Sequence, residues 1–389
     1  MNRVEELIQQ LCPNGVEWKK LGEVCLVTIG EFVHKNKQSD TGKYPVYNGG
    51  ISYTGFYDEF NNTGNKIIIS ARGANAGYVN RAFCNYWAGN SCYSLSVITG
   101  VPLDWTFLFY YLKNRQSDFT NIQQKGGIPA VSKNQICDFE IPIPPLPIQQ
   151  EIVRILDTFT ELTANLQTEL DARKKQYAYY RDCLLNFEGA DGVEWKKLGE
   201  MCDFQNGFSF KSSTFKKQGK PILRITNIKD SIIDTSSLVY FEDMDYIGQD
   251  LSQFKVVKGD IVIAMSGATT GKLGYLTSDE IFYLNQRVGK FVPKSNLDRR
   301  YLFHYLQLKT NDIYVMAGGG AQPNLSSTKL LNDFSIPIPP LPEQRRIVAI
   351  LDHFETLVND LSVGLPAELE ARRKQYEYYR DKLLTFDRV

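Results

Sequence analysis

The chain has 389 residues, of which 43% are hydrophobic and 12% aromatic, enough for two domains that each bury a core. Lysine plus arginine equals aspartate plus glutamate, 44 of each, so net charge neither demands nor excludes a nucleic-acid partner. Basic residues outnumber acidic ones in residues 24–137 and 201–332, and the rest of the chain is net acidic. This distribution is compatible with nucleic-acid binding by those two stretches.

No apolar run approaches the roughly 20 residues that cross a bilayer, so we expect no membrane segment. The seven cysteines form no Cys-x-x-Cys pair, and their odd number predicts reduced thiols in the cytoplasm. The first residues, MNRVEELIQQL, predict a short amphipathic helix at 3–11 rather than a targeting segment.

Internal repetition is the strongest feature of the sequence. GVEWKKLGE occurs at 15–23 and again, letter for letter, at 192–200. A longer pair follows: 138–159 returns as 333–354, and 172–187 returns as 371–386, with few changes. The chain therefore consists of two tandem units of roughly 195 residues, each a variable stretch followed by a near-identical one.

The two variable stretches differ in sequence but share a scaffold. Residues 66–79 and 260–273 each predict a strand, a turn of the form Gly-Ala-x-x-Gly, and a second strand. Helical patterns follow near 103–114 and 298–309, and glycine-rich segments lie around 126–127 and 318–320. Each variable stretch is thus expected to form a mixed α/β domain.

The near-identical stretch predicts a long helix. Successive prolines make residues 141–147 extended, and apolar or aromatic residues then recur in steps of three and four over about 35 residues, roughly 50 Å of helix. Two such helices predict an antiparallel coiled coil within the chain. A parallel pairing between two chains is the alternative.

Leucines recur every fourth residue in both helices, and the second copy carries one extra tetrad. That tetrad includes Gly364 and Pro366, so we expect a kink or break there. Because the chain opens with a GVEW box and closes with a helix, the repeat order is circular. The two termini should therefore lie close together, with the helix at 3–11 near the last helix.

The GVEWxxLGE box, the IPIPPLPxQ segment, the leucine tetrads and the RKKQYxYYRDxLL helix end, each present twice, resemble the DNA specificity subunits of type I restriction-modification systems. The resemblance covers nearly the whole chain. It implies that each variable stretch is a target-recognition domain reading one half of a bipartite double-stranded DNA target. It also implies that the helices set the half-site spacing and dock two methyltransferase subunits.

The resemblance further implies a subunit without a catalytic centre. S-adenosylmethionine, ATP and Mg²⁺ would belong to the partner methyltransferase and restriction/translocase subunits, and this chain would bind no cofactor or metal and no membrane.

The expected fold is α+β, with two mixed α/β target-recognition domains joined by two long helices as a pseudo-two-fold tandem repeat. The expected segments are 1–23 (N-terminal helix and GVEW box), 24–137 (first recognition domain), 138–187 (central helix), 188–200 (linker and second GVEW box), 201–332 (second recognition domain) and 333–389 (C-terminal helix).

No motif qualifies as a catalytic centre. GATTGK at 267–272 superficially resembles a phosphate loop, but it has three residues between its glycines instead of four, and Leu273 follows the lysine. We interpret it as a hairpin turn. The histidines His34, His304 and His353 are scattered, so no metal cluster or nucleophilic triad is predicted.

Candidate DNA contacts are polar or basic residues on the predicted turns and loops, because Arg suits guanine, Asn and Gln suit adenine, and Lys more often holds phosphate. In the first domain they are Lys35, Lys37, Tyr53, Arg72, Asn75, Tyr78 and Arg81. In the second domain they are Asn206, Lys211, Arg224, Asn227, Ser266, Thr269, Lys272, Gln286 and Arg287.

Two other classes of function remain open from the residues alone. One is a structural coiled-coil dimer with β-rich head domains, which an obligate dimer formed through residues 152–186 would support. The other is an enzyme in its own right, which turnover of nucleotide or DNA by the purified chain alone would support.

Overall fold

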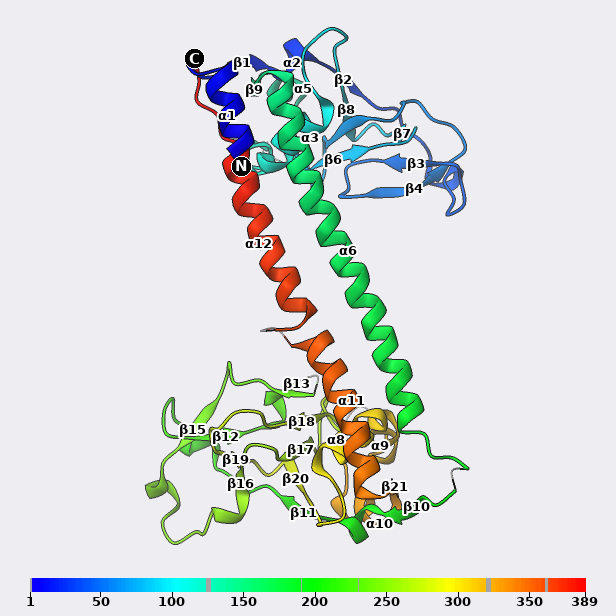
Figure 1. Cartoon of the computed structure of the whole chain (residues 1–389), viewed down its shortest axis with the longest axis vertical. Coiled ribbons are helices and arrows are strands. Elements are labelled where there is room, and N and C mark those ends of the chain that lie inside the picture. Colours follow the sequence, from blue (N-terminus) through cyan, green and yellow to red (C-terminus); the bar gives the residue numbers. More distant parts are fainter. Residues whose placement is uncertain (1, 124–126, 190, 230, 320–322, 361–362) are drawn as a thin grey trace. The chain divides into compact units, whose positions relative to one another are not determined.

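The computed structural model describes residues 2–123, 127–189, 191–229, 231–319, 323–360 and 363–389 (Figure 1). The chain divides into two compact units. Unit 1 comprises residues 1–167 and 368–389, and unit 2 comprises residues 168–367.

Three sheets form among the described residues of unit 1. The strands are β1 (Glu17–Lys20) with β9 (Glu140–Ile143); β2 (Cys25–Ile29), β8 (Cys92–Val97), β5 (Lys66–Ser70) and β6 (Val79–Ala82) in that spatial order; and β4 (Tyr53–Tyr57), β3 (Tyr44–Tyr47) and β7 (Trp87–Ala88). Its helices are α1 (Asn2–Leu11), α2 (Leu21–Val24), η1 (Lys35–Lys37), α3 (Trp105–Asn114), α4 (Gln116–Asn121) and α5 (Lys133–Cys137).

Unit 2 repeats this plan with longer connections. Its strands are β10 (Glu194–Lys197) with β21 (Ser335–Ile338); β11 (Cys202–Asn206), β20 (Val288–Pro293), β17 (Ile261–Ala264) and β18 (Leu273–Tyr275); β15 (Val239–Phe241), β12 (Lys220–Leu223), β19 (Phe282–Leu284) and β16 (Lys255–Val256); and β13 (Ile228–Lys229) with β14 (Ile232–Ile233). Its helices are α7 (Leu198–Met201), η2 (Ser212–Thr214), η3 (Ile225–Asn227), η4 (Asp243–Tyr246), η5 (Ser252–Phe254), α8 (Arg299–Leu308), α9 (Thr310–Met316) and α10 (Ser327–Asp333).

The pairing of these strands confirms the tandem repeat and the mixed α/β content. The order β2-β8-β5-β6 in unit 1 matches β11-β20-β17-β18 in unit 2. The parallel pair β3–β7 likewise matches β12–β19. The GVEWKK copies pair with the IPI copies in the same register, since Trp18 lies opposite Pro142 and Trp195 opposite Pro337. Much of the near-identical sequence is therefore the common scaffold of the two units.

The helices predicted after the strands are present. α3 and α8 each begin at an aspartate cap. The Asp104 side chain accepts hydrogen bonds from the amides of Thr106 and Phe107, and the Asp298 side chain accepts from those of Arg300 and Tyr301. Five residues of α3 and six of α8 are buried. The glycine-rich segments were also predicted, but Gly126 and Gly320 lie outside the described residues.

The first long helix is α6 (Leu146–Leu184), with 39 residues, and it contributes to both units. It begins two residues earlier than expected, because Leu146 and Pro147 belong to its first turn. A proline is tolerated there, since the backbone amides of a first turn have no hydrogen-bond acceptor within the helix.

The second long helix is broken, as the extra tetrad predicted. It forms α11 (Leu341–Asn359) and α12 (Leu365–Leu383), and Gly364 and Pro366 lie at the break. Leu361 of the leucine series lies outside the described residues.

Each unit contains ring stacking between α6 and one piece of the second helix. In unit 1, Phe159 of α6 stacks on Tyr379 of α12, with ring centroids 5.5 Å apart and an interplanar angle of 26°. In unit 2, Tyr180 of α6 stacks on Phe354 of α11 at 5.4 Å and 25°. Since Phe159 corresponds to Phe354 and Tyr379 to Tyr180, the two units use the same pair of rings.

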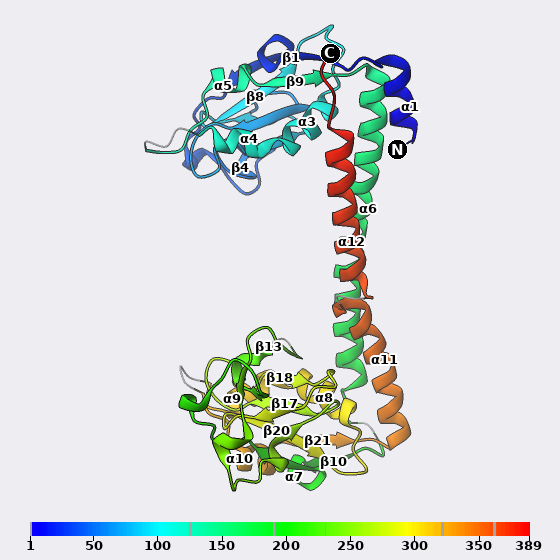
Figure 2. The ribbon, with the colours of Figure 1, turned by 90° about the vertical axis from the view of Figure 1, so that its left-hand side faces the viewer.

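The termini meet within unit 1, as the circular order predicted. The Val16 amide donates to the Asp387 carbonyl at 2.9 Å, and Lys382 pairs with Glu5 of α1 at 3.1 Å. Val4 and Leu7 of α1 share a core with Leu383 and Leu384. Both views show α1 against the ends of α6 and α12 (Figures 1 and 2).

Among the described residues, no helix combines the length and the apolar character required to cross a membrane.

Candidate nucleic-acid interface

A Gly-Ala-x-x-Gly turn joins two strands in each variable domain. The Ala76 amide donates to the Gly73 carbonyl at 3.0 Å, and the Thr270 amide donates to the Gly267 carbonyl at 3.0 Å. Gly73 and Gly267 have φ values of 96° and 82°, which most side chains disfavour. Since β17 and β18 pair antiparallel on either side, the segment 267–272 is a hairpin turn, as interpreted from the sequence.

In the first domain, two neighbouring segments hold this turn through backbone hydrogen bonds. The Ala71 amide donates to the Ser91 carbonyl at 2.8 Å, and the Val131 amide donates to the Ala71 carbonyl at 2.9 Å. Arg72 itself forms an isolated bridge with Ala130. The backbone of Arg72 is therefore fixed, while its side chain is exposed.

The second domain holds its turn in the same way. The Met265 amide donates to the Arg287 carbonyl at 2.8 Å, and the Leu325 amide donates to the Met265 carbonyl at 2.7 Å. Ser266 forms an isolated bridge with Asn324. Position 266 thus corresponds to position 72, and position 287 corresponds to position 91.

Three of the candidate residues in the second domain meet in one polar hollow. Ser266, Gln286 and Arg287 line an open hollow of about 740 Å³ together with Pro323 and Asn324. Gln286 and Arg287 are exposed, so their side chains are available to a ligand in this hollow.

Other candidates of this domain lie on neighbouring segments. Asn206 is exposed at the end of β11, and its amide donates to the Ser327 hydroxyl at 3.4 Å. Lys211 is exposed, whereas Arg224, Thr269 and Lys272 are half-buried.

Asn227 is a wrong prediction. Its side chain is fully buried, accepts a hydrogen bond from the Arg224 amide at 3.0 Å, and donates to the carbonyls of Asp234 and Ser237. It shapes a loop from inside and offers nothing to a ligand.

The first-domain candidates are less concentrated. Lys35 and Lys37 are exposed on η1, Tyr53 is half-exposed on β4, and Asn75 is exposed on the Gly-Ala-x-x-Gly turn beside Arg72.

Tyr78 and Arg81 lie in packed surroundings. The Lys113 ammonium of α3 lies 3.8 Å from the centre of the Tyr78 ring. The Arg81 guanidinium lies 4.3 Å from the centre of the Phe109 ring and 4.7 Å from that of Phe83. The Arg81–Phe109 contact joins β6 to α3, and the cation–π contacts already engage the side chains of both Tyr78 and Arg81.

A buried glutamine ties each variable domain to its long helix, which the sequence did not single out. Gln149 of α6 is fully buried. Its Oε1 accepts from the Asp104 amide at 2.7 Å, and its Nε2 donates to the carbonyls of Pro102 and Pro144 at 2.9 and 2.6 Å.

The same arrangement recurs in unit 2. Gln344 of α11 is fully buried, accepts from the Asp298 amide at 2.8 Å, and donates to the carbonyls of Asn296 and Pro339. We call Gln149 and Gln344 the glutamine clamps. All these partners are backbone atoms, which lie either next to the start of α3 or α8 or just before the start of α6 or α11.

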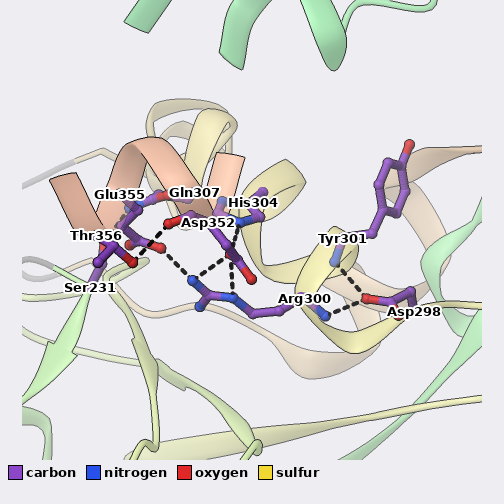
Figure 3. A network of polar contacts seen from close by, with 9 residues as sticks. All are labelled: Ser231, Asp298, Arg300, Tyr301, His304, Gln307, Asp352, Glu355 and Thr356. Atoms are coloured by element: carbon purple, nitrogen blue, oxygen red, sulfur yellow. Dashed lines mark hydrogen bonds and ion pairs between the residues drawn. The ribbon is translucent and has the colours of Figure 1, made fainter. Parts of the chain in front are cut away.

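A charged network joins α8 to α11 in unit 2 (Figure 3). Arg300 of α8 pairs with Asp352 at 2.8 Å and also with Glu355, both on α11. His304 of α8 is fully buried, and its Nε2 lies 2.7 Å from Asp352 Oδ1. In unit 1 a tyrosine takes the place of His304. The Tyr110 hydroxyl donates a hydrogen bond to Asp157, which is equivalent to Asp352, at 2.5 Å.

The ligand atoms of His304, Asp352 and Glu355 lie within 4.8 Å of one another, a group that the scattered histidines of the sequence did not predict. The Arg300 guanidinium already supplies the positive charge that the two carboxylates require. The arrangement therefore fits an ion-pair network that docks the domain.

This network predicts an acid-sensitive step in the stability of unit 2. Burial raises the pKa of Asp352, but its hydrogen bonds with His304 and Arg300 and the Arg300 charge outweigh burial, so the net pKa is lowered. Its contribution to stability is then complete above the unfolded-state pKa, about 4, and is lost as pH falls through the lowered native value. Urea unfolding between pH 7 and pH 3 should show a steeper loss for the unsubstituted chain than for Asp352→Asn.

Asp279→Asn is the matched control, because Asp279 forms an exposed pair with Lys258 at 3.0 Å. This variant should follow the unsubstituted chain at every pH. An equally steep loss in Asp352→Asn would show that Asp352 is not the responsible group.

A family model, related sequences and a solved structure all point to the same protein family. The family model described as "Type I restriction modification DNA specificity domain" matches residues 13–172 and 190–371. A type I restriction enzyme specificity subunit of Escherichia coli is 38% identical over 298 residues, which cover 72% of this chain and 70% of that protein. A putative type I restriction enzyme specificity subunit of Haemophilus influenzae is 32% identical over 388 residues, covering 95% and 96% of the two chains.

A solved structure has a similar fold. The crystal structure of a type I restriction-modification system S subunit from M. genitalium aligns with a TM-score of 0.64 at 21% identity, covering 97% of this chain and 98% of that one.

Proposed function

Since this chain belongs to the family of type I restriction-modification DNA specificity subunits, we propose that it reads a split double-stranded DNA target, one half with each variable domain. One observation carries the proposal most directly. The same strand–turn–strand scaffold occurs in both domains, held by the same backbone hydrogen bonds, but with different side chains at its turns. A common scaffold with unlike turns suits the recognition of two unlike half-sites.

We propose residues 24–137 and 201–332 as the two recognition domains. The remaining segments are the N-terminal helix with the first GVEW box (1–23), the central helix (138–187), the linker with the second GVEW box (188–200) and the C-terminal helix (333–389). The DNA-contacting set proposed is the predicted set without Asn227. Within it, Arg72, Asn75, Gln286 and Arg287 are exposed on turns, which favours them over Tyr78 and Arg81, whose side chains are engaged in packing.

We further propose that α6 forms an antiparallel coiled coil with α11 and α12. Two ring pairs support this proposal. Phe159, in the first half of α6, stacks on Tyr379 of α12, and Tyr180, near the end of α6, stacks on Phe354 of α11, which precedes α12 in the chain. A helix of 39 residues is about 58 Å long, so such a pair would convert residue number into half-site separation.

The near-identical helices are proposed to dock two methyltransferase subunits, because a surface present twice suits two copies of one partner. A restriction/translocase subunit would complete the assembly in the cytoplasm. The chain itself would be non-catalytic, with S-adenosylmethionine, ATP and Mg²⁺ bound by those partners.

The test is a genome-wide map of methylated adenines in cells that express this chain with its methyltransferase, compared with cells that lack the chain. We expect one motif of two short blocks around an unspecified gap. Exchanging residues 24–137 for those of a relative should change one block only. If the assembled methyltransferase methylates no split motif, the result would favour the alternative function, a structural coiled-coil dimer with β-rich head domains.

A further inference from the structure

The Arg72 position of the first domain lies where three segments meet. The Gly89 carbonyl accepts from the Cys92 amide at 3.2 Å, so Asn90 and Ser91 are the central residues of a tight turn. A Cβ atom at Gly49 would lie 2.2 Å from the Arg72 carbonyl oxygen and 3.6 Å from the Ser91 Cβ. The end of β3, the Gly-Ala-x-x-Gly turn and the turn of Asn90 and Ser91 are therefore in contact.

The second domain has the same meeting point with different side chains. The Asn285 carbonyl accepts from the Val288 amide at 2.8 Å, so Gln286 and Arg287 are the central residues of the corresponding turn. The Gln286 Oε1 accepts from the Ser209 hydroxyl at 2.6 Å, which orients its amide.

Backbone hydrogen bonds fix which positions correspond. The Gly89 amide donates to the Tyr47 carbonyl, and the Asn285 amide donates to the Leu223 carbonyl. Together with the bonds of Ala71 and Met265 described above, they equate positions 72, 90 and 91 with positions 266, 286 and 287. Each set contains one arginine, but the two arginines lie on different turns. Arg72 in the first domain is equivalent to Ser266 in the second, and Arg287 in the second domain is equivalent to Ser91 in the first.

Polar groups at the second meeting point lack partners. Within the described part of the chain, the hydroxyls of Ser266 and Thr269 and the Nε of Arg224 are buried without a hydrogen-bond partner. Because buried polar groups are nearly always paired, a water or another polar group is expected to satisfy these atoms, and the Ser266 hydroxyl lies beside the hollow that Gln286 and Arg287 line.

We propose that each domain reads bases at these three equivalent positions, and that Arg72 in the first domain and Arg287 in the second each read a guanine. The proposal rests on the proposed function. Arginine donates two hydrogen bonds to the O6 and N7 atoms of guanine in the major groove, and no other base offers that pair of acceptors. The neighbouring amides of Asn90 and Gln286 suit the N6 and N7 atoms of adenine.

The alternative role for the arginines is phosphate binding, which carries no sequence information. The geometry favours base reading, because both arginines lie on backbone that is held from neighbouring segments. A flexible loop would suit a phosphate contact equally well, whereas base reading needs a fixed donor.

The experiment maps methylated adenines for the complex with methyltransferase, comparing the unsubstituted chain with Arg72→Ala, Arg287→Ala and Arg287→Lys. Arg72→Ala should relax one guanine position in one block, with discrimination falling about tenfold or more, and Arg287→Ala should relax one guanine in the other block. Arg287→Lys keeps the charge but loses the paired donors, so it should relax the same position as Arg287→Ala. Each block serves as the internal control for the other.

Lys258→Ala is the charge control. Lys258 is exposed just before the start of β17, whereas Ser266 follows the end of that strand. Loss of the Lys258 charge should therefore leave the methylated motif unchanged. If an alanine variant fails to assemble with the methyltransferase, the Arg287→Lys map decides.

Unchanged blocks with only weaker methylation in the arginine variants would overturn the inference and assign the arginines to phosphates. Relaxation of the same block by both alanine variants would overturn it as well. These results differ from failure of the proposed function, in which the unsubstituted complex itself would methylate no split motif.

Discussion

Deleting Leu166–Glu169 from α6 is expected to shorten the gap of the methylated motif by about two base pairs and to leave both blocks unchanged. Four helical residues span about 6 Å, and successive base pairs are about 3.4 Å apart. The deletion keeps the leucine series in phase, because Leu170 takes the place of Leu166. It also removes no residue of either variable domain.

The measurement is the methylated-adenine map of the deletion variant. The matched control substitutes Gln167 and Thr168 by alanine, which changes the sequence of the tetrad at constant length and should leave the gap unchanged. A duplication of the tetrad should lengthen the gap by the same amount. An altered block in the deletion variant would refute the role of α6 as a ruler.

The second large effect is expected for Gln149→Leu. The substitution conserves volume but leaves the Asp104 amide and the carbonyls of Pro102 and Pro144 without a partner in a fully buried place. Each unsatisfied group costs about 1–3 kcal/mol, so we expect a loss of roughly 3–5 kcal/mol in the free energy of unfolding of unit 1.

The neighbouring residue provides the control. Gln150 is exposed on the same turn of α6, and Gln150→Leu should change the free energy of unfolding by less than about 0.5 kcal/mol. Urea unfolding of the two variants beside the unsubstituted chain measures the difference. Equal effects would mean that the clamp contributes nothing beyond the loss of one polar side chain.

The repeat explains why so much of the fold was predictable from the sequence. Two copies of each segment expose the shared scaffold, so the hairpin strands, α3, α8, α6 and the break at Gly364 were all expected, and all are present. Helical periodicity and proline or glycine positions are local signals, and they sufficed for these elements.

The candidate site was harder to predict because its signals are not local. An asparagine that holds its own loop, such as Asn227, has the same sequence context as one that faces a ligand. Asn90 and Ser91 were missed because only strand pairing places them beside Arg72. The clamp Gln149 was missed because its neighbour Gln150 is the same residue type, and only burial distinguishes the two.

The glutamine clamps have a consequence for how the variable domains diverge. Gln149 and Gln344 bind only backbone atoms, and Pro144 and Pro339 among their partners belong to the near-identical stretch itself. A clamp that contacts no variable side chain accepts any domain whose chain follows the same path at the start of α3 or α8. Recombination between genes at the borders of residues 24–137 or 201–332 would therefore preserve this backbone attachment, so a single genetic event can exchange a whole domain, provided that the incoming domain supplies side chains such as Arg300 that pair with the helix.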